Sequence, residues 1–388
     1  MRHYAAMTDW PRIRALFPAV EKQVYLNTAG GAPIPRPAAE AGKRYYEQSL
    51  ADGDVHWDDW LQQVEEARRK VATLINAAPE RVAFLANAST GLNFAAHMLR
   101  GRGSVLTVTD EFPSCTLPWL QLGYDVTFVQ AGDDGQVTVD DFEAALTDET
   151  AILCISHVQY KSGFRNNLFD LGQLCHDHDL VFVVDATQSF GAFPVDVGGA
   201  GIDFFVSSGY KWITAGYSVG ILCLSEAFLR SEAYPAVGWR SANEPYRLLC
   251  DRLDLSEAAA ALEQGHPPFA GVFSLSASLD LIDLIGLSEI EARILELTRY
   301  LHGRIAEKGI GIHSTAEESH LSGISIVAAD DPQSAVAYLK RRGIVTSTRG
   351  EGIRLSLHYF NNFEDIDRFV EEMDSIAGTG TSPTPQQT

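Results

Sequence analysis

The sequence lacks an excess of positive charge, a long apolar run and a paired cysteine pattern. Its 51 acidic and 30 basic residues give a formal net charge of −21. This argues against nucleic acid or an anionic membrane surface as the main partner, because both are bound through Lys and Arg. No apolar stretch reaches the length of a membrane-spanning helix, and the charges and proline near the N-terminus are atypical of a signal peptide.

Cysteine is scarce and irregularly placed. The five cysteines, an odd number, are widely separated along the chain, at Cys115, Cys154, Cys175, Cys223 and Cys250. This spacing predicts neither a disulfide framework nor a zinc site, and we expect no metal. We interpret the cysteines as small buried side chains in a protein of the reducing cytoplasm.

Helical and strand patterns alternate between residues 58 and 224. Short continuous apolar runs predict buried strands, and apolar residues at helical spacing over 58–76 predict a helix. The predicted strands are residues 81–85, 104–109, 125–130, 151–156, 180–184, 202–207 and 219–224, and further helices are predicted at 90–99, 140–146 and 168–178. This order predicts an α/β fold with a mostly parallel sheet covered by helices on both faces.

The pattern changes after about residue 250. Helices are predicted at residues 255–263, 275–308, 332–342 and 362–376, with short strands at 323–328 and 352–357. This favours a smaller C-terminal α+β domain that begins in a Gly/Pro-rich stretch. We predict an N-terminal segment (1–20), a large domain (21–265), a small domain (266–377) and a flexible tail (378–388).

A carboxylate follows one predicted strand and a lysine follows the next. Asp185 follows the apolar residues LVFVV in LVFVVDATQ, at the edge of an open sheet where ligands bind. Its alternative role is a helix cap or loop acid. Lys211 lies between two aromatic residues in IDFFVSSGYKW, where burial would lower its pKa and raise its nucleophilicity. Its alternative role is a surface lysine with a packed stem.

Together these residues match the requirements of pyridoxal phosphate (PLP). The cofactor needs a lysine for a Schiff base and a carboxylate that keeps its ring nitrogen protonated. It also needs a phosphate site, and Ser89 and Thr90 open a predicted helix with hydroxyls and free N–H groups. The same two residues, taken alone, also suit an ordinary helix cap.

With DATQS and SSGYKW in place, the sequence resembles the class V aminotransferase group of fold-type I PLP enzymes. This group includes cysteine desulfurases, selenocysteine lyases, kynureninases and isopenicillin N epimerase-like proteins. The resemblance runs from YLN at residues 25–27 to RLSLH at residues 354–358. It implies a seven-stranded, mostly parallel sheet and a homodimer whose active sites lie at the subunit interface.

The resemblance also implies a role for individual residues. Lys211 would form the Schiff base, and Asp185 would face the ring nitrogen. The other cofactor-binding residues would be Ser89, Thr90, Ser208 and Tyr210 at the phosphate, Gln188 and Tyr160 near the ring hydroxyl, Phe112 stacked on the ring, and His266 at the partner subunit's phosphate. Arg354 would hold the substrate α-carboxylate, with Asn27 as a further substrate-binding residue.

Departures from the desulfurase pattern direct the functional prediction. Cysteine desulfurases carry a mobile catalytic cysteine near residues 342–350, where this sequence reads RGIVTSTRG. Persulfide chemistry at that place is therefore disfavoured. Phe112 replaces a histidine and cannot shuttle protons, so Lys211 is predicted to be the main proton-transfer group.

We predict β-elimination of the C–S lyase type on an α-amino acid, with α-proton abstraction by Lys211. The alternative is an epimerase or aminotransferase of the isopenicillin N epimerase-like group, in either case with a place in secondary metabolism. Decarboxylation and kynureninase activity are less favoured. A binding module without chemistry is disfavoured by the intact Lys211, Asp185 and Gln188, and a nicotinamide dehydrogenase by the lack of G-x-G-x-x-G after a strand.

Overall fold

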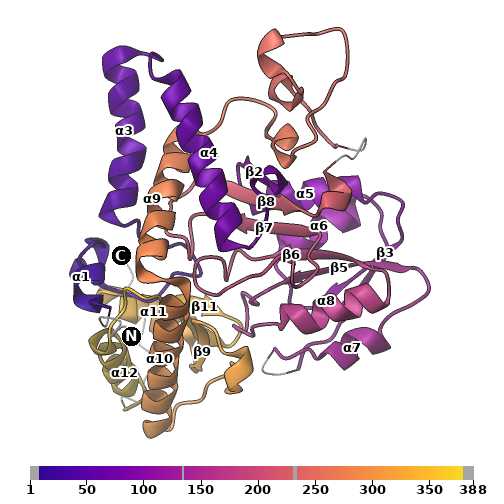
Figure 1. Ribbon diagram of the computed structural model, residues 1–388. Helices are drawn as coiled ribbons and strands as arrows, with labels where there is room; N and C mark the ends of the chain where they lie inside the picture. Colours follow the sequence, from indigo (N-terminus) through magenta and orange to yellow (C-terminus); the bar gives the residue numbers. More distant parts are fainter. Residues whose placement is uncertain (1–7, 133–134, 230–233, 379–388) are drawn as a thin grey trace, which may run out of the picture.

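A seven-stranded sheet forms the centre of the computed structural model, which describes residues 8–132, 135–229 and 234–378. The strand order is β2-β8-β7-β6-β5-β3-β4 (Figure 1). The strands are β2 (Val82–Leu85), β3 (Ser104–Val108), β4 (Val126–Val129), β5 (Thr150–Ser156), β6 (Val181–Asp185), β7 (Phe204–Ser208) and β8 (Gly220–Leu224). The strand β8 runs opposite to the other six strands, so the predicted mostly parallel sheet is confirmed.

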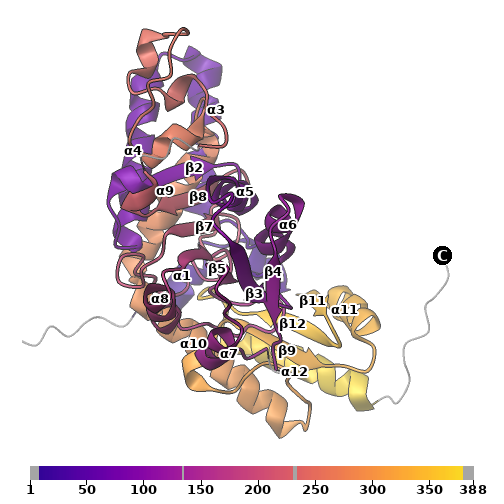
Figure 2. The ribbon, with the colours of Figure 1, turned by 90° about the vertical axis from the view of Figure 1, so that its right-hand side faces the viewer.

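Helices cover both faces of this sheet (Figures 1 and 2). One face packs on α5 (Ala88–Met98) and α6 (Pro113–Gln121), and the other on α4 (Trp57–Leu74), α8 (Leu168–Asp177) and α9 (Phe269–Ile285). In β6, Val181 and Val183 join the α5–α6 core, whereas Phe182 and Val184 join the opposite core. Because strand side chains alternate, Asp185 continues the face that α5 and α6 cover.

A second, antiparallel sheet has the order β11-β12-β9. Its strands are β9 (Ile324–Ala328), β11 (Ser347–Arg349) and β12 (Gly352–Ser356), and it shares a core with α10 (Leu287–Glu307), α11 (Pro332–Arg341) and α12 (Phe363–Gly378). The N-terminal β1 (Val24–Tyr25) pairs with β10 (Ile344–Val345), and Asn27 bridges to Ser356. The division at residue 265 stays a prediction, and residues 379–388 of the predicted tail lie outside the described residues.

Two predicted helices differ from the structure. Residues 255–263 form only a short 3-10 helix, η5 (Ala259–Glu263), because Leu255 bridges to Ala242 and Glu263 is held by a 2.7 Å buried ion pair with Arg68. The predicted helix 275–308 is two helices, α9 and α10, which meet at Gly286 with a φ of +91°. No described helix is by itself long and apolar enough to cross a membrane, and α9 and α10 qualify only as a pair bent by 80°.

Further helices were not predicted. The helix α3 (Arg36–Asp52) buries only Ala38, Ala41 and Gly42, so it carries no clear apolar stripe. The helix α6 starts at Pro113 and contains Pro118, which obscures its helical pattern in the sequence.

Candidate active site

Asp185 ends β6 and is held in a fixed position. One carboxylate oxygen, Oδ1, accepts a hydrogen bond of 2.8 Å from the backbone N–H of Thr187. The other, Oδ2, lies 3.6 Å from the Sγ of Cys115 on α6. The side chain is buried on the face that α5 and α6 cover, and both of its oxygens have a protein contact.

Lys211 is buried just beyond the end of β7. Its Nζ lies 5.6 Å from the ring centre of Phe112 and 5.5 Å from that of Tyr210. Burial lowers the pKa of Lys211 to about 8; Asp185 opposes this shift, and the positive charges of Arg354 and Arg349 add to it. Asp185, Lys211 and Arg354 are therefore close enough for the charges of Asp185 and Arg354 to shift the pKa of Lys211.

The predicted phosphate-binding residues gather at the start of α5. The hydroxyl of Ser208 accepts a 3.0 Å hydrogen bond from Ala88 N–H, which joins the end of β7 to the first turn of the helix. The hydroxyl of Ser89 lies 2.7 Å from that of Ser114 on α6. The helix begins at Ala88 rather than Thr90, because Asn87 caps it and accepts 3.0 Å from Thr90 N–H.

A glycine in β8 makes this arrangement possible. A Cβ atom at Gly220 would lie 2.5 Å from the backbone of Asn87, so only glycine lets the capped end of α5 approach the sheet this closely. Tyr210, two residues after Ser208, stacks on Tyr217 with ring centres 4.4 Å apart. Ser114, Asn87 and Tyr217 are neighbours of the phosphate-binding candidates that the sequence analysis did not name.

Gln188 is buried with both ends of its amide engaged. Its Nε2 donates to Ala29 O at 3.1 Å, and its Oε1 accepts from Trp212 Nε1 at 3.0 Å. The first of these bonds ties the N-terminal segment to the site. In that segment Asn27 has a buried Oδ1 with no hydrogen-bond partner among the described residues.

Tyr160 connects the two sheets at the site. Its ring meets Phe112 edge-on at 5.3 Å, and its carbonyl accepts a 3.2 Å hydrogen bond from Arg354 Nη1. The Arg354 side chain is 1% exposed, and burial, reinforced by the charge of Arg349, lowers its pKa to about 9. The structure thus brings Phe112, Tyr160 and Arg354 to the Lys211 group.

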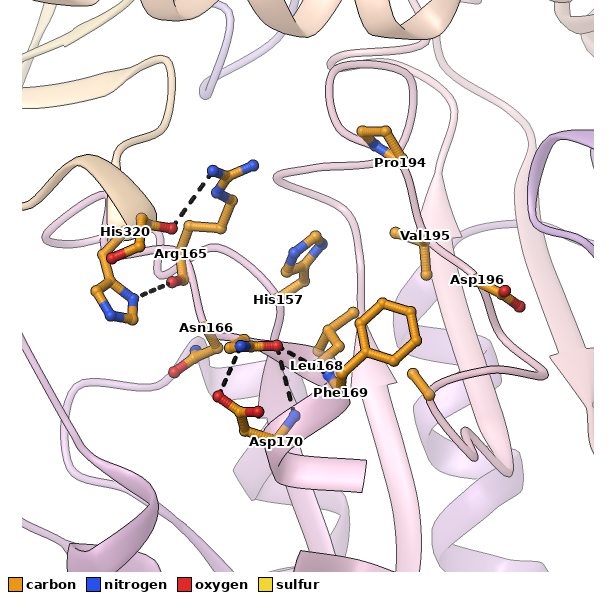
Figure 3. A pocket seen from close by; sticks show the side chains of 13 residues that line it. His157, Arg165, Asn166, Leu168, Phe169, Asp170, Pro194, Val195, Asp196 and His320 are labelled. Atoms are coloured by element: carbon orange, nitrogen blue, oxygen red, sulfur yellow. Dashed lines mark hydrogen bonds between the residues drawn. The ribbon is translucent and has the colours of Figure 1, made fainter. Parts of the chain in front are cut away.

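Two histidines do not join this group in the described chain. The exposed ring of His266 meets Trp57 at 5.1 Å and Trp239 at 5.2 Å, next to the start of α9. The ring of His157 lines a different cavity of about 420 Å³ on the α8 side of the sheet, together with Arg165, Asn166 and His320 (Figure 3). Burial, together with Arg165, lowers the pKa of His157 to about 3, so its ring is neutral.

Glu111 is a buried acid beside the site that the sequence analysis did not single out. Its carboxylate accepts hydrogen bonds from the backbone N–H of Phe112, from both N–H and hydroxyl of Ser156, and from Gln159 Nε2, at 2.5 to 3.0 Å. Burial raises the pKa of Glu111 despite these bonds. It follows an apolar strand, the same signal that pointed to Asp185.

These residues fit PLP. A buried lysine with a lowered pKa, a fixed carboxylate, hydroxyl groups at a helix N-terminus and a buried guanidinium form the donor set that the cofactor and an amino-acid carboxylate need. In particular, Nε and Nη2 of Arg354 are buried without a hydrogen-bond partner among the described residues. Such donors are expected where a bound anion completes the hydrogen bonds.

Known proteins resemble this chain over nearly its whole length. A probable cysteine desulfurase of Methanothermobacter thermautotrophicus is 28% identical, covering 95% of this chain and 98% of its own. The uncharacterized aminotransferase YcbU of Bacillus subtilis is 25% identical over 93% of this chain and 96% of its own.

Solved structures agree in fold. The cysteine desulfurase of Thermococcus onnurineus NA1 has a TM-score of 0.89 at 25% identity, covering 97% of this chain and all of its own. The cystine C–S lyase C-DES has a TM-score of 0.85 at 20% identity, covering 92% of this chain and 99% of its own. The family model described as Aminotransferase class-V matches residues 24–369. The chain belongs to the class V aminotransferase family.

Proposed function

We propose that this protein is a PLP-dependent enzyme that breaks the C–S bond of an α-amino acid by β-elimination. The observation that carries the proposal is the burial of Lys211 near Asp185 and Arg354, whose Nε and Nη2 have no protein partner among the described residues. The neighbouring β10–β11 segment carries no cysteine. Family membership and a relative named as a probable cysteine desulfurase support sulfur amino-acid chemistry.

Residues from both sheets would hold the cofactor and the substrate. Ser89, Thr90, Ser208 and Tyr210 would bind the phosphate, and Asp185 would pair with the ring nitrogen through Oδ2, whose protein contact is the weak Cys115 donor. Arg354 would grip the substrate α-carboxylate with the two nitrogens that have no protein partner. When bound, PLP supplies an electron sink for the charge that develops at the substrate α-carbon.

Lys211 would act as the base. Its lowered pKa of about 8 increases the neutral fraction of the amine near physiological pH, and the neutral Nζ can accept the proton from the substrate α-carbon. Phe112 and Tyr210 flank that Nζ and carry no group that titrates near neutral pH. Epimerisation needs a second group that returns a proton to the opposite face of the substrate α-carbon. A single base therefore favours loss of a β-substituent after proton removal.

The cysteines do not provide a persulfide carrier at the site. Four of the five are buried, and the exposed Cys250 lies between η4 (Pro245–Arg247) and η5. The hydrogen bond with Cys154 and burial raise the pKa of Cys115 well above its ordinary value, so this thiol stays protonated beside Asp185. Elimination without a thiol nucleophile is therefore the route that the site supports.

The products of the holoenzyme distinguish the candidate reactions. Incubation with L-cystine and with L-cysteine should release pyruvate and ammonia, and Lys211→Ala should release neither. Alanine in place of pyruvate would identify desulfuration through a persulfide and contradict the proposal. Racemised substrate would identify epimerisation, and a 2-oxo acid that keeps the substrate side chain would identify transamination; either would also contradict it.

We further propose a homodimer in the reducing cytoplasm. Exposed apolar residues gather on the upper part of α3 and on the segment 237–253, which both rise beyond the β2 edge of the sheet (Figures 1 and 2). His266 contacts Trp57, which begins α4 just after α3, and Trp239 in the segment 237–253, so a second subunit docked there would lie next to it. All five cysteines are free thiols, as the cytoplasm favours.

A further inference from the structure

Arg349 and Arg354 lie on the same face of the small sheet. In the antiparallel pair β11–β12, Arg354 is opposite Ser347, and Arg349 is opposite Gly352. Residues directly opposite each other share a face, and so do residues two apart in one strand. Arg349 is therefore the diagonal neighbour of Arg354, and both guanidinium groups contact Tyr160, one at its carbonyl and one 5.8 Å from its ring centre.

This face presents more hydrogen-bond donors than the chain uses. Nε and Nη2 of Arg354, Nε of Arg349 and the hydroxyl of Ser347 are buried without a partner among the described residues. Buried polar groups in native proteins nearly always find a partner. Four orphaned groups on one small surface indicate that an anionic ligand completes them.

The two positive charges also have no counter-charge from the protein. No ion pair within the described ranges involves either arginine, although Glu351 is in the turn between their strands. This is unusual in a chain that carries 51 acidic and 30 basic residues. One α-carboxylate would neutralise only one of the two guanidinium groups, which leaves a partly buried positive charge at a cost in free energy.

We propose that the site binds an acidic sulfur amino acid, with Arg354 on the α-carboxylate and Arg349 on a second anionic group carried by the leaving thiol. The deep arginine is the one next to the Lys211 group, and the half-buried Arg349 lies nearer the turn, where the end of a longer side chain would reach. This proposal rests on the proposed function for the reaction that follows binding. The assignment of Arg349 and Arg354 as binding residues does not depend on it.

A matched pair of probes isolates the second charge. S-Carboxymethyl-L-cysteine and S-carbamoylmethyl-L-cysteine have nearly the same size, and only the first carries a second carboxylate. Elimination would break the Cα–H and Cβ–S bonds, release the thiolate, and yield pyruvate and ammonia after addition of one water. With the first probe the thiol product is thioglycolate.

Binding is measured by calorimetry on the PLP-loaded Lys211→Ala variant, which removes turnover, and pyruvate release is measured on the otherwise unchanged enzyme. The acidic probe should bind about tenfold or more tightly than the amide, as expected of a charge-assisted hydrogen bond. Adding Arg349→Gln should abolish this preference, because it weakens binding of the acidic probe far more than binding of the amide. Arg349→Lys, which keeps the charge, should retain part of the preference and controls for loss of folding.

The outcomes separate the two proposals. Equal affinity for both probes, or an equal loss for both in Arg349→Gln, would overturn the acidic-substrate site even if pyruvate is formed. A preference that depends on Arg349 would establish the site even if no pyruvate appears, and in that case the proposed elimination would fail instead.

Discussion

The thiol of Cys115 lies 3.6 Å from Oδ2 of Asp185, the acid that we place at the cofactor ring. The hydrogen bond with Cys154 and burial raise the pKa of this thiol, so it meets the carboxylate as a weak donor and not as a nucleophile. The position of a cysteine near the site therefore does not imply persulfide chemistry.

This relationship predicts that Cys115→Ala retains activity. We expect pyruvate formation from L-cystine to stay within about threefold of the unchanged enzyme, because the variant removes only a weak hydrogen bond. Lys211→Ala should lose about 10³-fold or more, as expected when a general base is removed. A lactate dehydrogenase-coupled assay measures both. A loss in Cys115→Ala as large as that in Lys211→Ala would show that the thiol takes part in the reaction.

The lowered pKa of Lys211 predicts how cofactor capture depends on pH. The neutral amine is the form that attacks the PLP carbonyl, so the rate at which the cofactor-free protein gains a visible absorption band should rise with pH and level off above about 8. Stopped-flow absorbance between about pH 6 and about pH 10 measures this rate. A rate that is still rising at the top of this range, as the ordinary lysine value of 10.5 predicts, would contradict the burial of this amine.

The neighbours of Lys211 should move this midpoint in opposite directions. Arg354→Gln removes a positive charge that lowers the pKa of Lys211, so the midpoint should shift to higher pH. Asp185→Asn removes a negative charge that raises it, so the midpoint should shift to lower pH. Shifts in the same direction would mean that the variants act through altered packing rather than charge.

Much of this site was predictable because its strongest signals are local in the sequence. Asp185 directly follows an apolar run and Lys211 lies three residues beyond the end of β7, and parallel strands bring the ends of such runs to one edge of a sheet. The phosphate-binding candidates followed from hydroxyl residues at a helix start. The start itself was misplaced by two residues, because the capping Asn87 gives no apolar signal.

The remaining features depend on contacts between distant segments. Glu111 gains its partners from Ser156 and Gln159, which belong to a different strand and the loop after it. The diagonal approach of Arg349 to Arg354 depends on the register of β11 and β12, and β11 was not among the predicted strands. The helix α3 was not predicted because its buried residues are small.

Glu111→Gln should destabilise the protein. The carboxylate accepts from four donors, and an amide would replace one acceptor with an N–H₂ group that faces them. We expect a loss of about 1–3 kcal/mol in the free energy of unfolding, the usual cost of an unsatisfied buried polar group. Urea denaturation followed by circular dichroism measures it. Glu111→Asp, which keeps the charge on a shorter stem, serves as a control; an unchanged Glu111→Gln would contradict a structural role for the network.

The same residue predicts a pH dependence of stability. Burial raises the pKa of Glu111 above the ordinary 4.5, so the folded protein binds this proton more tightly than the unfolded chain does. The contribution of Glu111 to the free energy of unfolding is complete below its pKa in the unfolded chain. It is lost as the pH rises through its pKa in the folded protein. Glu111→Gln should therefore unfold with a flatter dependence on pH above about 4.5 than the unchanged protein. An identical slope in both proteins would contradict the raised pKa.

Leu50 and Leu253 should be required for dimerisation. They are 89% and 75% exposed in the single chain, on α3 and on the segment 237–253, and burying such side chains at an interface gains about 1.5–3 kcal/mol each. The double variant Leu50→Asp, Leu253→Asp should be monomeric by light scattering coupled to size-exclusion chromatography. Leu284→Asp is the control, because Leu284 is equally exposed at 77% but lies at the far end of α9. A double variant that remains dimeric would place the interface elsewhere, and His266 would then have no route to a partner's cofactor.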